Sequence, residues 1–250
     1  MDTDISITIV MPCLNEEKNI GSAINSVLNY LNKTKIDSEL IIVNDGSTDN
    51  SINVINKYRN KKNVVIVSHK KNLGLGAAFK TALNYSTKSN IVLVPGDNEN
   101  DIKEAIKFLH LMKYVDIVVP FIINKNVRSF FRKITSALYL FIINTTFFTK
   151  LNYTNGTIIY KTSVLKQNNN FSNGFFYNTE ILIKLLKSGY IYAEIPSKLS
   201  VRNTGKSKAL TIKSFLNLSK NYIKLVIDIY FKKHKKQIIQ KSNTYKMLNG

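Results

Sequence analysis

Three acidic side chains that follow an apolar run are the clearest candidates for a functional site in the sequence. Residues 91–94 are apolar, a Pro-Gly pair follows, and then come Asp97, Glu99 and Asp101. Carboxylates at alternate positions can share one cation, and Mg²⁺ or Mn²⁺ accepts carboxylate oxygens together with substrate phosphates. These residues therefore predict a metal site. The alternative is an acidic loop that caps a helix starting directly after it, because Asp and Asn favour that position.

Two other apolar runs also end in polar residues, and these could hold a nucleotide. After residues 5–11 come Pro12 and the polar Asn15 and Glu16, and after residues 40–43 come Asn44 and Asp45. A carboxylate at a strand end can accept hydrogen bonds from a nucleobase or a ribose. For Asn44 and Asp45, the alternative is a turn that leads into a capped helix. For the residues after 5–11, the alternative is the start of a helix, whose first turn favours acidic residues.

A third set of residues is cationic and suits phosphate. Guanidinium groups match phosphate geometry, and hydroxyls and ammonium groups add further donors. The candidates are Arg128, Arg132 and Ser136, which are spaced by four and so share one side of a helix, and Arg202, Lys206, Ser207 and Lys208 around a glycine. The alternative is a solvated basic surface.

The elements that must position these residues alternate regularly in the first half of the chain. Helical spacing of apolar residues separates short, continuous apolar runs, which is typical of a mostly parallel sheet covered by helices on both faces. The expected strands are 5–11, 40–43, 64–67, 91–94 and 116–119, and the expected helices are 16–31, 49–58, 75–85 and 102–111. In such α/β sheets, ligands bind at the carboxyl ends of the strands.

The second half changes character. Residues 134–149 carry no charge but are too short and too polar for a confident transmembrane helix, which needs about 20 apolar residues, so a buried or interfacial helix is expected. An amphipathic helix is expected over residues 210–231, and the final dozen residues look frayed. The remaining expected elements are strands at 156–160 and 190–195 and a helix at 179–187 that ends near Gly189.

The charge of the chain is high and uneven. The formal net charge is +20, and residues 198–250 contain thirteen Lys or Arg but one acid, Asp228, so they contribute +12. Such a segment fits nucleic acid, an anionic membrane or a phosphorylated ligand, or it is a solubilising tail. A nucleic-acid module is disfavoured, because carboxylates at the strand ends would repel phosphate in the absence of a metal.

Cysteine and histidine usage narrows the chemistry further. One cysteine, Cys13, excludes an internal disulfide framework and a cysteine-based zinc site. His69, His110 and His234 are scattered, so they support neither a catalytic triad nor a histidine metal site. The first residues are acidic and do not resemble a secretory signal, so a cytoplasmic location is expected.

Several short motifs follow one another in a specific order and spacing. They are Met11-Pro12 with Asn15-Glu16, Val43-Asn44-Asp45-Gly46-Ser47 with Asp49, Asn72 with Gly74, the acidic motif at Asp97, Asn155-Gly156, residues 175–180, Glu194 with Pro196, and Arg202 with Gly205, Ser207 and Lys208. With these motifs, the sequence from about residue 7 to 208 resembles glycosyltransferase family 2, and particularly its dolichyl-phosphate mannosyltransferase-like branch.

The resemblance implies a nucleotide-sugar-binding, Rossmann-like GT-A fold and sugar transfer with inversion, assisted by Mg²⁺ or Mn²⁺. It implies that the nucleotide pocket is lined by Pro12, Asn15, Glu16, Asp45 and Asp97. It implies that Asp97 and Glu99 match the Asp-x-Asp metal motif, and that Asp101, the third candidate metal ligand, matches the Gln that often follows this motif. The diphosphate or the acceptor phosphate would be held by Arg128, Arg132, Ser136, Arg202, Ser207 and Lys208. This sequence departs from the family pattern where Asn44, Glu99 and Asn178 each stand in place of a common Asp.

The resulting hypothesis is a transferase domain over residues 1–208, followed by a basic amphipathic helix and tail over 209–250. The donor is a nucleoside-diphosphate sugar, and the acceptor is a polyprenyl phosphate at the cytoplasmic face of a membrane, to which the protein binds peripherally. A hydroxyl acceptor would need a general base, for which Glu180 is the candidate. The alternatives are a saccharide acceptor in surface polysaccharide assembly, and a non-catalytic protein that binds a nucleotide sugar or nucleic acid.

Overall fold

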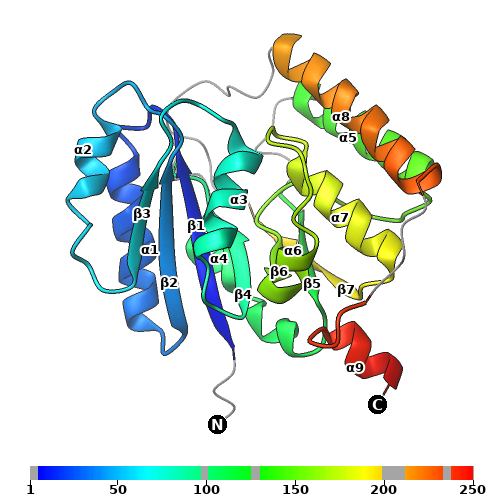
Figure 1. The fold of residues 1–250 in the computed structure, drawn as a ribbon, viewed down its shortest axis with the longest axis horizontal. Helices are drawn as coiled ribbons and strands as arrows, with labels where there is room; N and C mark the ends of the chain where they lie inside the picture. The colour runs from blue at the N-terminus through cyan, green and yellow to red at the C-terminus, as the bar shows by residue number, and fades with distance from the viewer. Residues whose placement is uncertain (1–4, 97–100, 125–129, 199–211, 233–237, 250) are drawn as a thin grey trace.

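A seven-stranded mixed sheet forms the centre of the molecule (Figure 1). The computed structural model describes residues 5–96, 101–124, 130–198, 212–232 and 238–249. The strand order is β3-β2-β1-β4-β6-β5-β7, and only β6 runs antiparallel to its neighbours within these described ranges. The strands are β1 Ser6–Cys13, β2 Asp37–Asn44, β3 Val64–Ser68, β4 Asn90–Leu93, β5 Ile117–Ile122, β6 Ile159–Lys161 and β7 Tyr192–Ser197.

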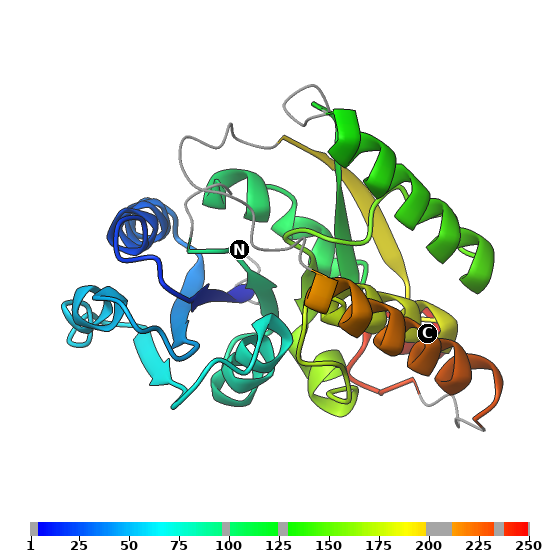
Figure 2. The same ribbon diagram turned by 90° about the horizontal axis from the view of Figure 1, so that it is seen from above.

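Helices cover both faces of the sheet, as Figure 2 shows from above. One face carries α1, α2 and α4, and the other carries α3, α6 and α7, while α5 and α8 lie across the end of the sheet at which β1 finishes (Figures 1 and 2). The helices are α1 Ile20–Lys33, α2 Ser51–Asn56, α3 Leu75–Tyr85, α4 Ile102–Ile106, a 3₁₀ turn at Leu109–Lys113, α5 Phe130–Phe147, α6 Thr162–Gln167, α7 Tyr177–Ser188, α8 Ile212–Tyr230 and α9 Asn243–Asn249.

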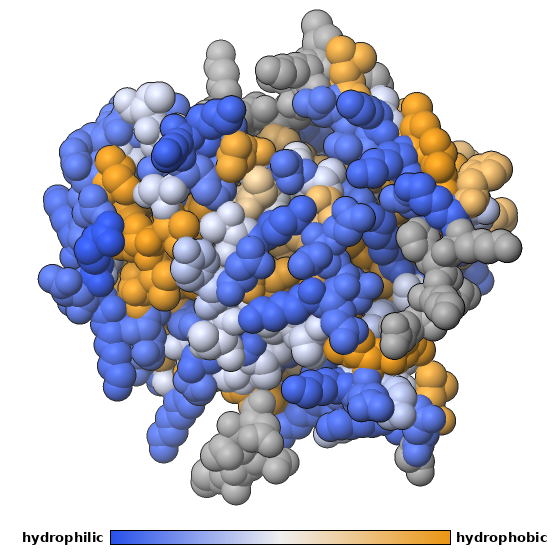
Figure 3. Space-filling model, in the orientation of Figure 1, coloured by the Kyte–Doolittle hydropathy of each residue, from blue (hydrophilic) through white to orange (hydrophobic). Residues whose placement is uncertain are grey.

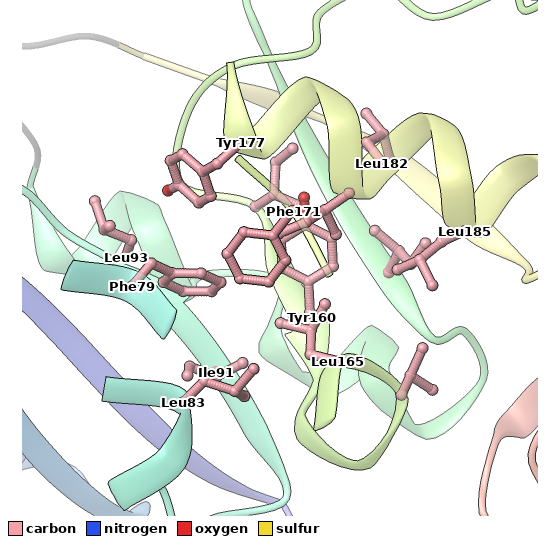
Figure 4. Packing of buried hydrophobic residues seen from close by; sticks show 14 of the residues in the cluster. Phe79, Leu83, Ile91, Leu93, Tyr160, Leu165, Phe171, Tyr177, Leu182 and Leu185 are labelled. Carbon is pink, nitrogen blue, oxygen red and sulfur yellow. The ribbon is translucent and has the colours of Figure 1, made fainter. Parts of the chain in front are cut away.

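The strands divide the core into two apolar clusters. Along β1, Val10 packs into one cluster while Ile9 and Met11 pack into the other, because successive side chains of a strand point to opposite faces. Both sets are fully buried, which explains why β1 is a continuous apolar run rather than an alternating one. Figure 4 shows the larger cluster, where Phe79 and Tyr177 lie with ring centroids 5.2 Å apart.

The alternation of strands and helices predicted for residues 5–122 is confirmed. The predicted helix at 75–85 matches α3, and the apolar stripe predicted for the first helix is the buried face of α1, which begins at Ile20 rather than at residue 16. The expected helix at 102–111 is instead the short α4 followed by a 3₁₀ turn. Helix α7 ends where Gly189 adopts φ 95°, a left-handed conformation that glycine accepts without steric cost.

The prediction that the final dozen residues are frayed is wrong. The side chain of Asp116, which is fully buried, accepts hydrogen bonds from the backbone N–H groups of Asn243 and Thr244 at 2.7 and 2.9 Å, and the Thr244 hydroxyl donates to it as well. The Asn243 side chain donates to the carbonyl oxygens of Met112 and Val115. These bonds pin α9 to the amino end of β5.

The two long helices of the second half are present, and both pack on the core by one side. In α5, Ile143 and Phe147 are fully buried, and in α8 Leu225 is fully buried. No helix in the described part of the chain is long and apolar enough to cross a membrane. The expected domain boundary after residue 208 lies outside the described residues.

Candidate functional site

The strand order predicts a ligand crevice at the carboxyl ends of β1 and β4. From β1 the chain proceeds outward through β2 to β3 and then returns to add β4 on the other side of β1. The order therefore reverses between β1 and β4, and in α/β sheets ligands bind outside the carboxyl ends of the strands at such a point. The segments that leave β1 and β4 at this edge begin at Leu14 and at Val94.

The loops after β1 and β2 are fastened to each other by side chains. Asn15 has φ 54°, and its side-chain oxygen accepts a hydrogen bond from the Thr48 backbone N–H at 2.8 Å. In return, the Asn15 N–H donates to the Ser47 hydroxyl at 3.0 Å, and the Glu16 N–H donates to the Ser51 hydroxyl at 2.9 Å. Two motifs that lie more than 30 residues apart are thus hydrogen-bonded into one rim of this predicted crevice.

Asp49 completes this fastening and is itself electrostatically tuned. It accepts hydrogen bonds from the N–H groups of Glu17 and Ser51, while Glu17 accepts from the Asn50 N–H. Burial alone would raise the pKa of Asp49, but hydrogen bonds from Ser51 and from backbone N–H groups lower it below its usual value. Burial raises the pKa of the nearby Cys13 thiol, which therefore stays protonated at neutral pH.

Asp45 is buried and holds the next loop in place. Its Oδ1 accepts from the Leu73 N–H at 2.9 Å and lies 2.7 Å from Nδ1 of His69, while its Oδ2 accepts from the Gly74 N–H at 2.9 Å. The other ring nitrogen of His69 lies 2.9 Å from the Thr81 hydroxyl oxygen. The carboxylate thus organises the entry to α3, and Oδ2 retains capacity for a further donor.

Gly96 brings the acidic segment to the β1 loop. It is buried, and a Cβ atom at this position would lie 2.6 Å from Ile20 Cδ1 and 3.1 Å from the Pro12 carbonyl oxygen, so a larger residue would displace the end of the Ile20 side chain and crowd Pro12. The residue directly before Asp97 is therefore packed against Pro12. Asp97 and Glu99 themselves lie outside the described residues. Among the residues that are described, no group of three or more His, Cys, Asp or Glu could hold a metal ion.

Asp101 acts as a helix cap. It is the N-cap residue of α4, and its side chain accepts a hydrogen bond from the Lys103 N–H at 2.9 Å. It also lines a shallow depression against the outer face of α1, beside Asn29 and Lys33. The capping interpretation of the acidic loop is thus confirmed for this residue, whose proposed part in metal binding remains a prediction.

The predicted phosphate ligands are described only in part. Arg132 is exposed in the first turn of α5, and Ser136 follows one turn later on the same side of that helix, as their spacing predicts. The remaining candidates, Arg128, Arg202, Lys206, Ser207 and Lys208, lie outside the described residues.

Glu180 is buried and fully engaged by protein groups. Its Oε1 lies 2.6 Å from Nζ of Lys184, and its Oε2 accepts from the Ser172 N–H at 2.7 Å. Lys184 also donates to the Asn170 carbonyl oxygen at 2.8 Å and lies 3.7 Å from Asp228 on α8. This arrangement favours a structural role in which Glu180 fixes the segment before α7, and its role as a general base remains a prediction.

That segment in turn seats the start of α3. The Asn173 carbonyl oxygen accepts from the N–H groups of Gly76 and Ala77, at 2.7 and 3.2 Å. A Cβ atom on Gly76 would come 2.1 Å from the Ser172 carbonyl oxygen, so the helix can approach this closely only because Gly76 lacks one. Glu180 therefore supports, through Ser172 and Asn173, the same helix entry that Asp45 holds from the other side.

Asn178, which the family resemblance identifies as a departure from the pattern, has both ends of its side-chain amide hydrogen-bonded. Its side-chain oxygen accepts from the Tyr160 hydroxyl at 2.7 Å, and its amide donates to the Gly156 carbonyl oxygen at 3.1 Å. It is buried, where a neutral amide costs less than a carboxylate without a cationic partner. Burial also raises the pKa of Tyr160, which stays a neutral donor.

The sheet order, the helices on both faces and the polar loops gathered at the carboxyl ends of β1 and β2 are those of an α/β protein with a GT-A-like fold. A family model described as glycosyl transferase family 2 matches residues 8–172. The chain therefore belongs to glycosyltransferase family 2, and it is a glycosyltransferase.

Relatives and solved structures agree with this assignment. An uncharacterized protein of Methanocaldococcus jannaschii is 26% identical over 87% of this chain and 97% of its own length. A dodecaprenyl-phosphate galacturonate synthase of Rhizobium johnstonii is 28% identical over 65% of this chain, and a dolichyl-phosphate beta-glucosyltransferase of Trichomonas vaginalis is 30% identical over 41%. The chain spans only 50% and 32% of the length of these two relatives.

The similarity to solved structures concerns the fold. Glucosyl-3-phosphoglycerate synthase from Mycobacterium tuberculosis, in complex with UDP, superposes with a TM-score of 0.66 at 19% identity, covering 90% of this chain and 79% of that one. The same enzyme has been crystallised with Mg²⁺ and UDP, and with Mn²⁺, UDP-glucose and phosphoglyceric acid. The predicted GT-A fold, with its mostly parallel sheet, is thereby confirmed.

Proposed function

We propose that this glycosyltransferase moves a sugar, with inversion, from a nucleoside-diphosphate sugar to a polyprenyl phosphate. The observation that carries the nucleotide-sugar part of this proposal is the packing of Gly96 against the Pro12 carbonyl oxygen. This contact brings the segment that leads to Asp97 close to the end of β1, where the proposed nucleotide loops begin. If the carboxylates of Asp97 and Glu99 continue from this point, where the strand order reverses, they would suit a charged diphosphate accompanied by a cation.

The nucleotide would lie against the joined loops after β1 and β2. Pro12, Asn15 and Glu16 offer backbone and side-chain groups on one side, and the remaining capacity of Asp45 Oδ2 offers an acceptor on the other. Because these loops are already fastened together, little conformational entropy is lost when a donor binds. The nature of the base and of the sugar is left to experiment.

Mg²⁺ or Mn²⁺ would be held by Asp97 and Glu99, whose oxygen donors suit hard cations, with Asp101 beside them. When bound, the ion would neutralise charge on the leaving diphosphate. The cationic candidates Arg128, Arg132, Ser136, Arg202, Ser207 and Lys208 would hold the diphosphate or the acceptor phosphate, because guanidinium and hydroxyl groups donate to phosphate oxygens.

A phosphate acceptor agrees with the environment of Glu180. A phosphate oxygen is ionised at neutral pH and can attack the anomeric carbon directly as the bond to the diphosphate breaks, so it needs positioning and no general base. Both oxygens of Glu180 are engaged by Lys184 and by the Ser172 N–H, and such a carboxylate is poorly placed to take a proton from an acceptor hydroxyl. The names of the polyprenyl- and dolichyl-phosphate relatives support the same acceptor class.

The experiment is a turnover panel of nucleoside-diphosphate sugars with Mg²⁺ or Mn²⁺, with and without polyprenyl phosphate. We expect one donor to be consumed rapidly only when polyprenyl phosphate is present, with the sugar recovered in a lipid-soluble product. Transfer to a saccharide acceptor and none to polyprenyl phosphate would contradict the proposed acceptor. Binding of a donor without turnover under any condition would contradict catalysis.

A further inference from the structure

The helices α5 and α8 each expose an apolar stripe on the side that faces away from the core. We call these stripes together the outer face, which consists of Phe130, Ile134, Leu138, Phe141 and Ile142 on α5 and Leu216, Ile223, Ile227, Tyr230 and Phe231 at α8 and its end. Several of these side chains are largely exposed, with Phe130 at 77%, Phe141 at 66% and Leu216 at 64%. Large apolar patches of this kind mark interaction sites in soluble proteins.

The exposure of the outer face does not result from poor packing of α5 and α8, because the opposite side of each helix is buried in the core. On α5, Ile143 and Phe147 are fully buried, and on α8 Leu225 is fully buried. The two helices are also joined by a hydrogen bond, in which the Tyr230 hydroxyl donates to the Thr146 carbonyl oxygen at 2.6 Å. The two alternatives for α8, a helix packed on the domain and a helix with a free apolar side, therefore both hold, on opposite sides of one helix.

The charges around the outer face have one sign. Helix α5 contains no acidic residue, and the only acid of α8 is Asp228, which is buried beside Lys184 and Lys232. Arg132 on α5 and Lys220 and Lys224 on α8 are exposed. Apolar side chains interleaved with lysines and without exposed acids are the composition of helices that lie in the headgroup region of an anionic bilayer.

The outer face also lies at the functional end of the molecule. Figure 1 shows α5 and α8 at the end of the sheet where β1 finishes, and Figure 2 shows the two helices running in a similar direction across that end. In Figure 3, apolar side chains stand out along the edge of the surface formed by these helices, among hydrophilic ones. A bilayer in contact with this face would present lipid phosphates at the same edge as the crevice between β1 and β4.

We propose that the outer face of α5 and α8 is a docking surface for an anionic lipid bilayer. The inference rests on the proposed function for its purpose, since a polyprenyl phosphate acceptor is reached only at a membrane. A second copy of the chain is a poorer occupant, because two surfaces rich in Arg and Lys on molecules of net charge +20 repel each other. The same charge attracts anionic headgroups, while the apolar stripes supply the buried area.

The test is co-sedimentation of the protein with vesicles of phosphatidylcholine alone and of phosphatidylcholine mixed with phosphatidylglycerol, in the absence of any donor sugar. We expect binding to the mixed vesicles that weakens as salt is raised. Leu138→Glu with Phe141→Glu, or Ile223→Glu with Ile227→Glu, should weaken it by more than about tenfold, because each change removes apolar area and adds repulsive charge. Lys220→Gln with Lys224→Gln should weaken it roughly fivefold per lysine.

Matched controls lie at the opposite end of the sheet. Tyr114, 69% exposed just before β5, and Lys61 and Lys62, exposed just before β3, offer similar side chains away from the outer face. Tyr114→Glu and Lys61→Gln with Lys62→Gln should leave vesicle binding unchanged. Circular dichroism melting shows whether each variant is folded, and the lysine variants keep the test valid if an apolar variant does not fold.

Three results would overturn the docking surface. These are absence of binding to mixed vesicles, binding that the α5 and α8 variants retain, and sedimentation equilibrium showing a dimer that only those variants dissociate. None of these measurements involves sugar transfer. A failure of vesicle binding is therefore distinguishable from a failure of the proposed acceptor, which would appear as lack of turnover with detergent-dispersed polyprenyl phosphate.

Discussion

The imidazole of His69 and the carboxylate of Asp45 form a single buried unit, with Nδ1 and Oδ1 2.7 Å apart. His69 is anchored on its other side by the Thr81 hydroxyl, 2.9 Å from Nε2, and Asp45 also receives the N–H groups of Leu73 and Gly74. One carboxylate thus joins the end of β2 to the loop that enters α3. Asp45 therefore has a positioning role in addition to the nucleotide contact proposed for it.

Replacing His69 tests that positioning role without removing a group that would touch the nucleotide. His69→Leu leaves a buried carboxylate short of one donor, so the free energy of unfolding should fall by about 1–3 kcal/mol. The KM for the donor sugar should rise roughly fivefold, equivalent to about 1 kcal/mol, with a smaller change in kcat. Urea denaturation and donor titrations measure the two effects. His110→Leu, at an exposed position, is the matched control. Equal effects in both variants would refute the positioning role of the His69–Asp45 pair.

Glu180→Gln separates a structural from a catalytic role for Glu180. The glutamine oxygen can still accept from the Ser172 N–H or from Lys184, so kcat with polyprenyl phosphate should stay within about tenfold of wild type. The free energy of unfolding should fall by about 1–3 kcal/mol as the charge pair with Lys184 is lost. Loss of a general base would instead lower kcat by roughly 10²–10⁴-fold, and such a loss in a folded variant would restore the catalytic interpretation.

Asp116→Asn tests how α9 is held. Asn keeps the size of the side chain but weakens the three hydrogen bonds from Asn243 and Thr244 and turns one acceptor into a donor. The free energy of unfolding in urea should fall by about 1–3 kcal/mol, as expected when a buried carboxylate loses hydrogen bonds from neutral donors. Asp37→Asn removes an exposed pair with Lys88 and should cost less than about 1 kcal/mol. Comparable losses in the two variants would show that α9 contributes little.

The pKa of Asp228 makes the attachment of α8 sensitive to acid. Burial would raise this pKa, but the hydrogen bond from Lys232 and the charges of Lys184 and Lys224 lower it below the ordinary value. A carboxyl group whose folded-state pKa is lowered stabilises the fold above its unfolded pKa, near 3.9, and loses that stabilisation as pH falls through its folded pKa. The stability difference between wild type and Asp228→Asn should therefore be largest at neutral pH and shrink below about pH 4. A difference independent of pH in urea titrations would contradict this.

The sequence predicts the framework of this protein well because the framework is encoded locally. Continuous apolar runs identify β1 to β5, and helical spacing of apolar residues identifies the buried side of α1. The site rim is predicted to the extent that Asn15, Glu16 and Asp45 each follow a strand. That Ser47 and Asp49 would fasten the β1 loop could not be predicted, since these hydrogen bonds depend on side chains more than 30 residues away.

Other features depend on pairing that no local pattern encodes. A strand is expected at residues 156–160, but its observed extent, Ile159–Lys161, and its antiparallel direction are set by pairing with β4 and β5. The ordered end of the chain depends on Asp116, more than 120 residues away. The pairing of Glu180 with Lys184 could have been predicted, because a Glu followed four residues later by a Lys favours an ion pair on a helix. The signal was present and indicates a structural use of the acid.

The central claim, that the acidic segment after β4 serves transfer to a polyprenyl phosphate, is tested most directly by two variants of that segment. The measurement is incorporation of radiolabelled sugar from the active donor into the lipid phase by Asp97→Ala and Asp101→Ala, with Mg²⁺ and with excess chelator. We predict that Asp97→Ala and chelation abolish incorporation in a folded protein, whereas Asp101→Ala, which removes a helix cap, costs about 1 kcal/mol of stability and retains most activity. Undiminished incorporation by Asp97→Ala, or by the wild type in chelator, would contradict the account.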